Sequence, residues 1–233
     1  MRHLVVAGSN SVDPDAVIGA DRLSRQAART SRVRWAPPLV AGTALGVANS
    51  MSNAFGSAYG PFTTTPGQGV RWLEYVSSWL GTPWAWALFA FGVGWFSRRL
   101  GAAALLATSS LLLAVLAYYV SDAVLGLNER LSVVEIQFWS AISLLVGPVM
   151  AVLGALAHRP RAWSLVPGLA APAVMVYFGL ARPSGNAQIQ PWAQWAVLGA
   201  AGLLAVALTV RAVLLNPPDR QRDSRPDPSR AVE

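Results

Sequence analysis

Cysteine and lysine are absent from this sequence, and charged residues of any kind are scarce. Only 12% of the 233 residues are charged, whereas an ordinary soluble domain carries about a quarter. The lack of cysteine excludes disulfides, thiol nucleophiles and cysteine metal ligands. Because the few charges cluster between long uncharged runs, the composition favours a membrane protein with several spans over a soluble domain.

Histidine and the common catalytic motifs are equally scarce. His3 and His158 are the only histidines, and both stand outside the long apolar runs. The sequence has no His-Glu-x-x-His zinc motif, no Gly-x-Ser-x-Gly nucleophile turn and no phosphate-binding Walker loop. A Ser/His pair inside a membrane cannot be assembled without a histidine there. We therefore expect no enzymatic activity, no cofactor and no metal site.

The longest apolar run sets the expected fold. Residues 100–121 hold twenty-two positions without a charge, and a helix needs roughly 20 apolar residues to cross a bilayer core. Similar runs elsewhere predict an all-α, polytopic bundle of six transmembrane helices within residues 35–215. The six predicted helices cover about 35–55, 79–96, 100–121, 133–157, 162–181 and 192–215. After the first of them, the spacing of Trp72, Val76 and Trp79 predicts a short amphipathic helix lying in the membrane interface.

Arginine is distributed unevenly between the two sides of such a bundle. Residues 1–34 and 216–233 are polar tails that we expect to be disordered, and six helices place both tails on one side. These tails and the turns at 98–99 and 159–161 carry fifteen arginines, with Arg211 included, and the other loops carry three. Positive residues accumulate on the cytoplasmic side. The chain is therefore predicted to be N-in and C-in, with the lipid bilayer rather than nucleic acid as its partner.

Several short motifs support a bacterial membrane protein. Arginine in place of lysine, with abundant alanine, suggests a GC-rich bacterial genome and hence the bacterial cytoplasmic membrane. The motifs, in chain order, are Ala48-Asn49-Ser50, Pro83-Trp84, Arg98-Arg99, Tyr118-Tyr119 and Gly147-Pro148. Together they resemble an uncharacterised family of actinobacterial six-helix integral membrane proteins with a domain of unknown function, over roughly residues 36–215. The resemblance implies a six-helix membrane protein and carries over no activity and no site.

Two acids flank one predicted hairpin. Asp122 ends the third predicted helix and Glu135 begins the fourth, so the two carboxylates are expected to face each other across one connection. Acids at membrane depth are costly and often mark ion or substrate pathways. The alternative is that both lie in the headgroup layer, where the helix N-terminus favours Glu135. Other polar residues at the same end complete a candidate pocket: Asn49, Asn53, Tyr118 and Tyr119.

Two prolines, Pro148 and Pro172, fall near the middle of consecutive predicted helices. Each leaves the carbonyl four residues earlier without its helical donor, and interrupted helices at the membrane midplane build sites in many transporters. The alternative is that these prolines only bend their helices. We include both in the candidate polar pathway with the residues of the pocket.

Two functional hypotheses follow from these patterns. The first is a small transporter or permease-like protein that uses the candidate polar pathway. The second is a non-enzymatic membrane subunit or scaffold that binds another membrane protein, or a second copy of itself, through small-residue helix faces. Such faces occur at Gly42/Gly46 and at Gly199/Gly202, and small residues allow helix backbones to approach closely in lipid.

Overall fold

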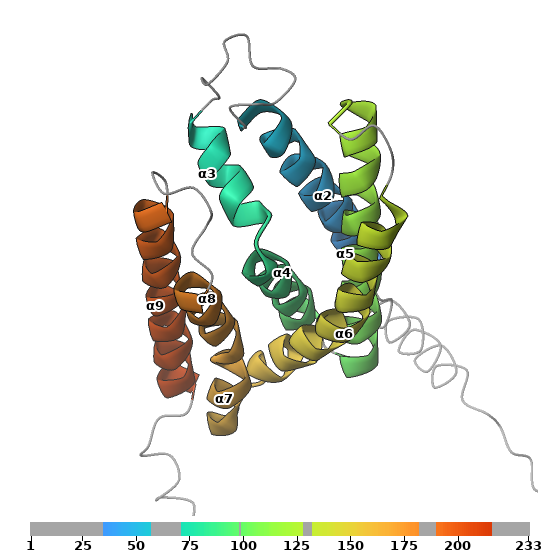
Figure 1. Cartoon of the computed structure of the whole chain (residues 1–233). Coiled ribbons are helices and arrows are strands. Elements are labelled where there is room, and N and C mark those ends of the chain that lie inside the picture. Colours follow the sequence, from blue (N-terminus) through green and yellow to red (C-terminus); the bar gives the residue numbers. More distant parts are fainter. Residues whose placement is uncertain (1–34, 57–70, 98, 128–131, 182–189, 216–233) are drawn as a thin grey trace, which may run out of the picture. The chain divides into compact units, whose positions relative to one another are not determined.

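The computed structural model of the chain describes residues 35–56, 71–97, 99–127, 132–181 and 190–215 (Figure 1). The predicted tails, 1–34 and 216–233, lie outside the described residues. The described part is all-α, as the sequence predicts. Its elements are α2 (Ala36–Gly56), α3 (Arg71–Leu80), α4 (Pro83–Phe96), α5 (Leu100–Val124), α6 (Val133–Ala157), the 3₁₀ turn η1 (Ala162–Ser164), α7 (Leu165–Gly168), α8 (Ala170–Ala181) and α9 (Gln190–Leu215).

Three helices are long and apolar enough to cross a membrane. They are Leu100–Val124, Val133–Ala157 and Gln194–Leu215, with mean hydropathies of 2.1 to 2.2. Twenty-five residues of helix rise about 37 Å, which exceeds a bilayer core of about 30 Å. A shorter apolar stretch covers Leu165–Leu180. These lengths make the chain a plausible multi-pass membrane protein.

The predicted second helix, 79–96, begins later than expected. Trp79 and Leu80 belong to α3, and α4 starts only at Pro83. Thr82 lies between them with an extended backbone (φ −89°, ψ 145°), because the ring of a following proline disfavours the helical region. With 14 residues, α4 alone spans only about 21 Å. The second apolar segment is therefore a pair of helices with a break at Gly81–Thr82.

The predicted fifth helix, 162–181, is also interrupted. It consists of η1, α7 and α8, with a gap at Leu169. Pro172 has no N–H to offer the carbonyl of Gly168, where α7 ends. Helical hydrogen bonds continue on both sides of the gap, from Leu169 N to Leu165 O and from Ala173 N to Leu169 O. The chain therefore keeps its direction through the interruption.

Small residues bring α2 and α5 into backbone contact. A Cβ on Gly42 would overlap the carbonyl of Ser110, and one on Gly46 would overlap the carbonyl of Ala114. The Gly42/Gly46 face is thus occupied inside the chain. The paired residues rise together in number, so α2 and α5 run parallel to each other.

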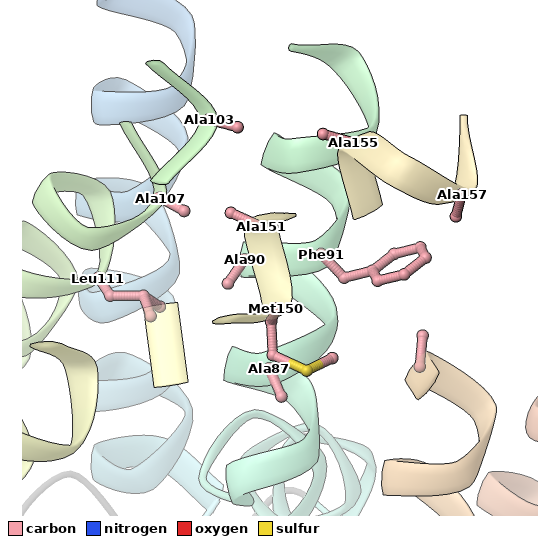
Figure 2. Packing of buried hydrophobic residues seen from close by; sticks show 11 residues of the cluster. Ala87, Ala90, Phe91, Ala103, Ala107, Leu111, Met150, Ala151, Ala155 and Ala157 are labelled. Atoms are coloured by element: carbon pink, nitrogen blue, oxygen red, sulfur yellow. The ribbon is translucent and has the colours of Figure 1, made fainter. Parts of the chain in front are cut away.

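The same packing joins α4 to α6. A Cβ on Gly94 would overlap the Ala151 carbonyl, and one on Gly154 would overlap the Phe91 carbonyl. Most residues of the surrounding core are alanines from α4, α5 and α6, as Figure 2 shows. In lipid, where burial of apolar surface drives helix association weakly, close backbone packing of this kind is the main source of contact energy.

One arginine connects α9, α6 and α4. The guanidinium of Arg211 donates to the carbonyls of Ala157 (2.9 Å) and His158 (2.7 Å) at the C-terminus of α6. Its carbon atom Cζ also lies 4.5 Å from the ring centroid of Trp95. Carbonyls at a helix C-terminus lack intrahelical donors, so Arg211 satisfies two of them while stacking on an aromatic ring.

Candidate functional site

Asp122, in the last turn of α5, is a buried carboxylate. Only 3% of its surface is exposed. The hydroxyl of Ser50, on α2, donates to Asp122 Oδ1 at 2.5 Å. A second side-chain hydrogen bond joins Asp122 to Tyr118, one turn earlier on α5. Charge-assisted hydrogen bonds of this kind offset part of the cost of burying a carboxylate.

A chain of hydrogen bonds extends from Tyr118 to α3. The amide of Asn53 donates from Nδ2 to the Tyr118 hydroxyl at 3.0 Å, and the Ser77 hydroxyl donates to Asn53 Oδ1. We call Ser50, Asn53, Ser77, Tyr118 and Asp122 the polar network. Each group donates to the next, from Ser77 to Asn53, from Asn53 to Tyr118 and from Tyr118 to the Asp122 carboxylate. Ser50 donates to the same carboxylate. The network therefore ties α2, α3 and α5 together around one negative group.

Asn49 lies next to this network. It is 4% exposed and stands one helical turn before Asn53 on the same face of α2. Its Oδ1 is buried and, among the described residues, has no hydrogen-bond partner. A Cβ added to Gly81 would lie 3.7 Å from that oxygen. Asn49 thus points toward the break between α3 and α4.

The break itself is well satisfied by hydrogen bonds. Gly81 N donates to Ser77 O at 2.9 Å, the Thr82 hydroxyl donates to Trp79 O at 2.6 Å, and the Trp86 indole donates to Leu80 O at 2.7 Å. Three of the carbonyls that end α3 therefore have specific partners. Residues after α3 thus donate hydrogen bonds to its last carbonyls and stabilise the interruption.

The amphipathic helix predicted around Trp72, Val76 and Trp79 is α3, and the structure shows its packing partner. In the structure α3 packs along α2 (Figure 1), and the pairs Ser77–Asn53 and Gly81–Asn49 show that the two helices are antiparallel. The sequence pattern predicted the amphipathic helix correctly but did not show that its Ser77 bonds to α2.

Tyr119 and Glu135 form a second, more exposed contact beside the polar network. Tyr119 is buried and makes a side-chain hydrogen bond with Glu135 of α6. Its ring meets that of Tyr118 edge-on, with centroids 5.1 Å apart. Glu135 is exposed, and its backbone N–H is capped by the Ser132 hydroxyl. The two acids of the predicted hairpin thus occupy different environments, Asp122 inside and Glu135 at the rim.

The two prolines lie apart from the polar network. Pro148 is inside α6, thirteen residues beyond Glu135 and therefore roughly 20 Å along the helix axis. Pro172 is buried in the first turn of α8, which packs against α4 and α9. The residues of the candidate polar pathway therefore separate into a group near Asp122 and two prolines that lie elsewhere, inside α6 and α8.

The candidate pocket predicted from the sequence did not include Ser50 or Ser77. For Ser50 a signal was present, because it continues the small-residue stripe of Gly42 and Gly46 at the same spacing of four and so faces α5. For Ser77 no comparable signal exists, since its partner Asn53 comes from α2 across the α2–α3 connection. Hydroxyls at other depths, on Ser110 and Ser143, bond to carbonyls of their own helices instead.

The outer face of α2 offers a different kind of surface. A shallow groove of about 520 Å³ runs from Leu39 to Met51 and is lined almost entirely by apolar side chains. Its one hydroxyl, on Thr43, donates to Leu39 O at 3.0 Å. This groove suits lipid chains, and the polar chemistry of α2 lies on the opposite face.

Comparisons with known proteins do not extend this description. No family model, no curated protein and no solved structure matches the chain significantly. Within the described residues, no group of three or more His, Cys, Asp or Glu side chains is placed to hold a metal ion. The arrangement near Asp122 is thus one buried carboxylate surrounded by hydroxyls and amides, beside an interrupted helix.

Proposed function

We propose that this chain crosses a bacterial cytoplasmic membrane six times, with both termini in the cytoplasm. The contacts support this threading. Because α2 and α5 run parallel, the segment between them must return across the membrane, and α3 with α4 is the described segment that does so. The pairs Thr108–Gly147 and Tyr119–Glu135 show that α5 and α6 are antiparallel. The pairs Gly168–Leu208 and Gly179–Leu198 show the same for the α7–α8 segment and α9. The six-helix resemblance of the sequence implies the same number of crossings.

Cysteine labelling tests this topology on a cysteine-free background. Leu127→Cys lies between α5 and α6, and Ser97→Cys lies between α4 and α5. A membrane-impermeant maleimide should label Leu127→Cys in intact cells and Ser97→Cys only after permeabilisation. The reverse pattern, or labelling of both positions in intact cells, would overturn the proposed orientation.

We propose further that the protein is a small transporter or permease-like protein whose pathway begins at the polar network. The supporting observation is the buried Asp122 carboxylate, whose hydrogen-bond chain through Tyr118 and Asn53 reaches Ser77 of α3, one turn before the break between α3 and α4. Buried acids and interrupted helices are the features from which membrane transporters build ion and substrate sites. We propose a non-enzymatic role, because the proposed topology places both histidines on the cytoplasmic side, away from this carboxylate.

Reconstituted protein allows a direct test. Liposomes of phosphatidylethanolamine and phosphatidylglycerol are loaded with a pH-sensitive dye, and a potassium diffusion potential drives proton entry. Wild-type protein should raise the rate at least about tenfold over empty liposomes. Asp122→Asn and Glu135→Gln should remove the increase while both variants remain folded, and Ser143→Ala, which alters a hydroxyl bonded within α6, serves as the matched control. Unchanged flux in both acid variants would refute the proposed pathway.

A second role, as a membrane subunit, is favoured by α9. The apolar window of this helix is only 17% buried, and a Cβ added at Gly199 or Gly202 would meet nothing within 4 Å. Of the two small-residue faces in the sequence, this one remains open, whereas Gly42/Gly46 is covered by α5. Mild extraction with a C-terminal tag, followed by mass spectrometry, should recover a partner at fixed stoichiometry that is lost in Gly199→Leu. A homogeneous protein without a partner would exclude this role.

A further inference from the structure

The unsatisfied oxygen of Asn49 is the starting observation. In the part of the chain that the structure describes, Asn49 Oδ1 is the one buried side-chain polar atom without a hydrogen-bond partner. Leaving such an atom buried and unpaired destabilises the folded state. A native structure retains an orphaned acceptor of this kind mainly where a bound water, ion or ligand completes it.

The surroundings of that oxygen are rich in further oxygen ligands. Ser50 follows Asn49 directly in α2, and its Oγ lies 2.5 Å from Asp122 Oδ1. Because Oγ donates its one hydrogen to the carboxylate, its lone pairs remain available. On the other side, Gly81 marks the break in the α3–α4 segment. Asn49 and Ser50 are thus consecutive in α2, and the Ser50 hydroxyl bonds directly to the Asp122 carboxylate, so an amide oxygen, a hydroxyl oxygen and a carboxylate belong to neighbouring residues.

The chemistry of these groups selects the class of ligand. All are hard oxygen donors, which prefer alkali and alkaline-earth cations over transition metals. Asp122 contributes one negative charge, and Glu135 is exposed at the rim. A monovalent cation neutralises one buried carboxylate, whereas a divalent cation would leave a net positive charge, which is costly away from water. Membrane transporters coordinate Na⁺ at the ends of interrupted helices, and Asn49 Oδ1 lies near Gly81, just beyond the end of α3.

We propose that Asn49, Ser50 and Asp122 form a binding site for Na⁺ beside the break between α3 and α4. The inference rests on the proposed transport function, since it names the ion that the polar network would accept. Binding is measured in detergent, where no transport occurs, so the two proposals succeed or fail separately.

Purified full-length protein in mild detergent provides the test. Thermal unfolding is followed by tryptophan fluorescence at constant ionic strength, with choline chloride replaced stepwise by NaCl or KCl. A ligand that binds only the folded state raises the melting temperature, and above its dissociation constant the rise follows the logarithm of the ligand concentration. We expect such a rise with NaCl and a smaller one with KCl. Binding of radioactive ²²Na⁺ to immobilised protein supplies an independent dissociation constant.

Three variants make the test specific. Asn49→Ala and Asp122→Asn should each weaken ²²Na⁺ binding by about tenfold or more, as expected for loss of a ligand group. In choline, Asn49→Ala should melt at or above the wild-type temperature, because it removes an unsatisfied buried oxygen. Ser143→Ala, the control, should bind Na⁺ as the wild type does.

The possible results separate the explanations. Equal stabilisation by NaCl, KCl and choline, or full ²²Na⁺ binding by both Asn49→Ala and Asp122→Asn, would overturn the sodium site and leave Asn49 as a water-binding residue. Sodium binding without either proton entry or ²²Na⁺ uptake in liposomes would support the site and refute the transport role. Flux without sodium binding would support the transport role and refute the sodium site.

Discussion

Removal of the Arg211 guanidinium should destabilise the bundle strongly. The side chain makes two hydrogen bonds to carbonyls that end α6, at 2.9 and 2.7 Å, and stacks on Trp95. Hydrogen bonds from a charged donor are worth about 1.5–3 kcal/mol each, and the cation–π contact is worth about 0.5–1 kcal/mol. Because Arg211 is partly exposed and the contacts are not additive, we expect Arg211→Met to cost about 2–4 kcal/mol.

The measurement is the melting temperature in mild detergent, followed by tryptophan fluorescence. For a chain of this length, 1 kcal/mol corresponds to roughly 2–4 °C, so Arg211→Met should melt about 5–10 °C below the wild type. Arg211→Lys keeps the charge but loses the planar fork that reaches two carbonyls at once, and it should recover less than half of the loss.

The matched control is Arg161→Met, an exposed arginine in the turn after α6. It removes the same charge from the same end of the bundle and should melt within about 1 °C of the wild type. If Arg211→Met and Arg161→Met melted at the same temperature, the connection through Arg211 would contribute no stability, and the reasoning above would be wrong.

Two further substitutions test the α2–α5 contact. Gly46→Ala should lower the melting temperature by a few degrees, because the added methyl overlaps backbone atoms of α5 and overpacking costs about 1–3 kcal/mol. Gly92→Ala, at a position with open space, should be neutral or stabilising, and a loss equal to that of Gly46→Ala would contradict the packing argument. Ser50→Ala should cost about 1–3 kcal/mol, since Asp122 loses a buried donor. Ser143→Ala, whose hydroxyl bonds within its own helix, should cost less, and equal effects would argue against a special role for the Ser50 hydroxyl.

Some features of the candidate site were predictable and others were not. The grouping of Asp122 with Tyr118 follows from their spacing of four on one helix, which places them on one face. Asn53 and Ser50 join them only because α2 lies along α5, a contact set by Gly42 and Gly46. The unsatisfied state of Asn49 Oδ1 is invisible in the sequence, since it depends on which donors the neighbouring helices bring near.

The helix boundaries show the same division. Apolar runs of 25 residues, such as those of α5 and α6, determine helices by length and hydropathy alone. The second predicted helix starts at residue 79, whereas Trp79 and Leu80 belong to α3 and α4 begins at Pro83. The apolar run continues across this boundary, and hydropathy alone does not show where one helix ends and the next begins.

The sequence by itself determined the class of protein. Long uncharged runs, scarce charge and the absence of cysteine specify an all-α chain suited to a membrane, because the hydrophobic effect and the length of a helix act locally and leave a one-dimensional pattern. The tertiary structure alone decided which polar groups meet. The Ser50–Asp122 hydrogen bond joins residues 72 positions apart, and the Arg211 bonds to α6 span more than 50. Such contacts depend on the register and direction in which two helices pack. Small residues set both, because close packing requires the surfaces of the two helices to fit each other.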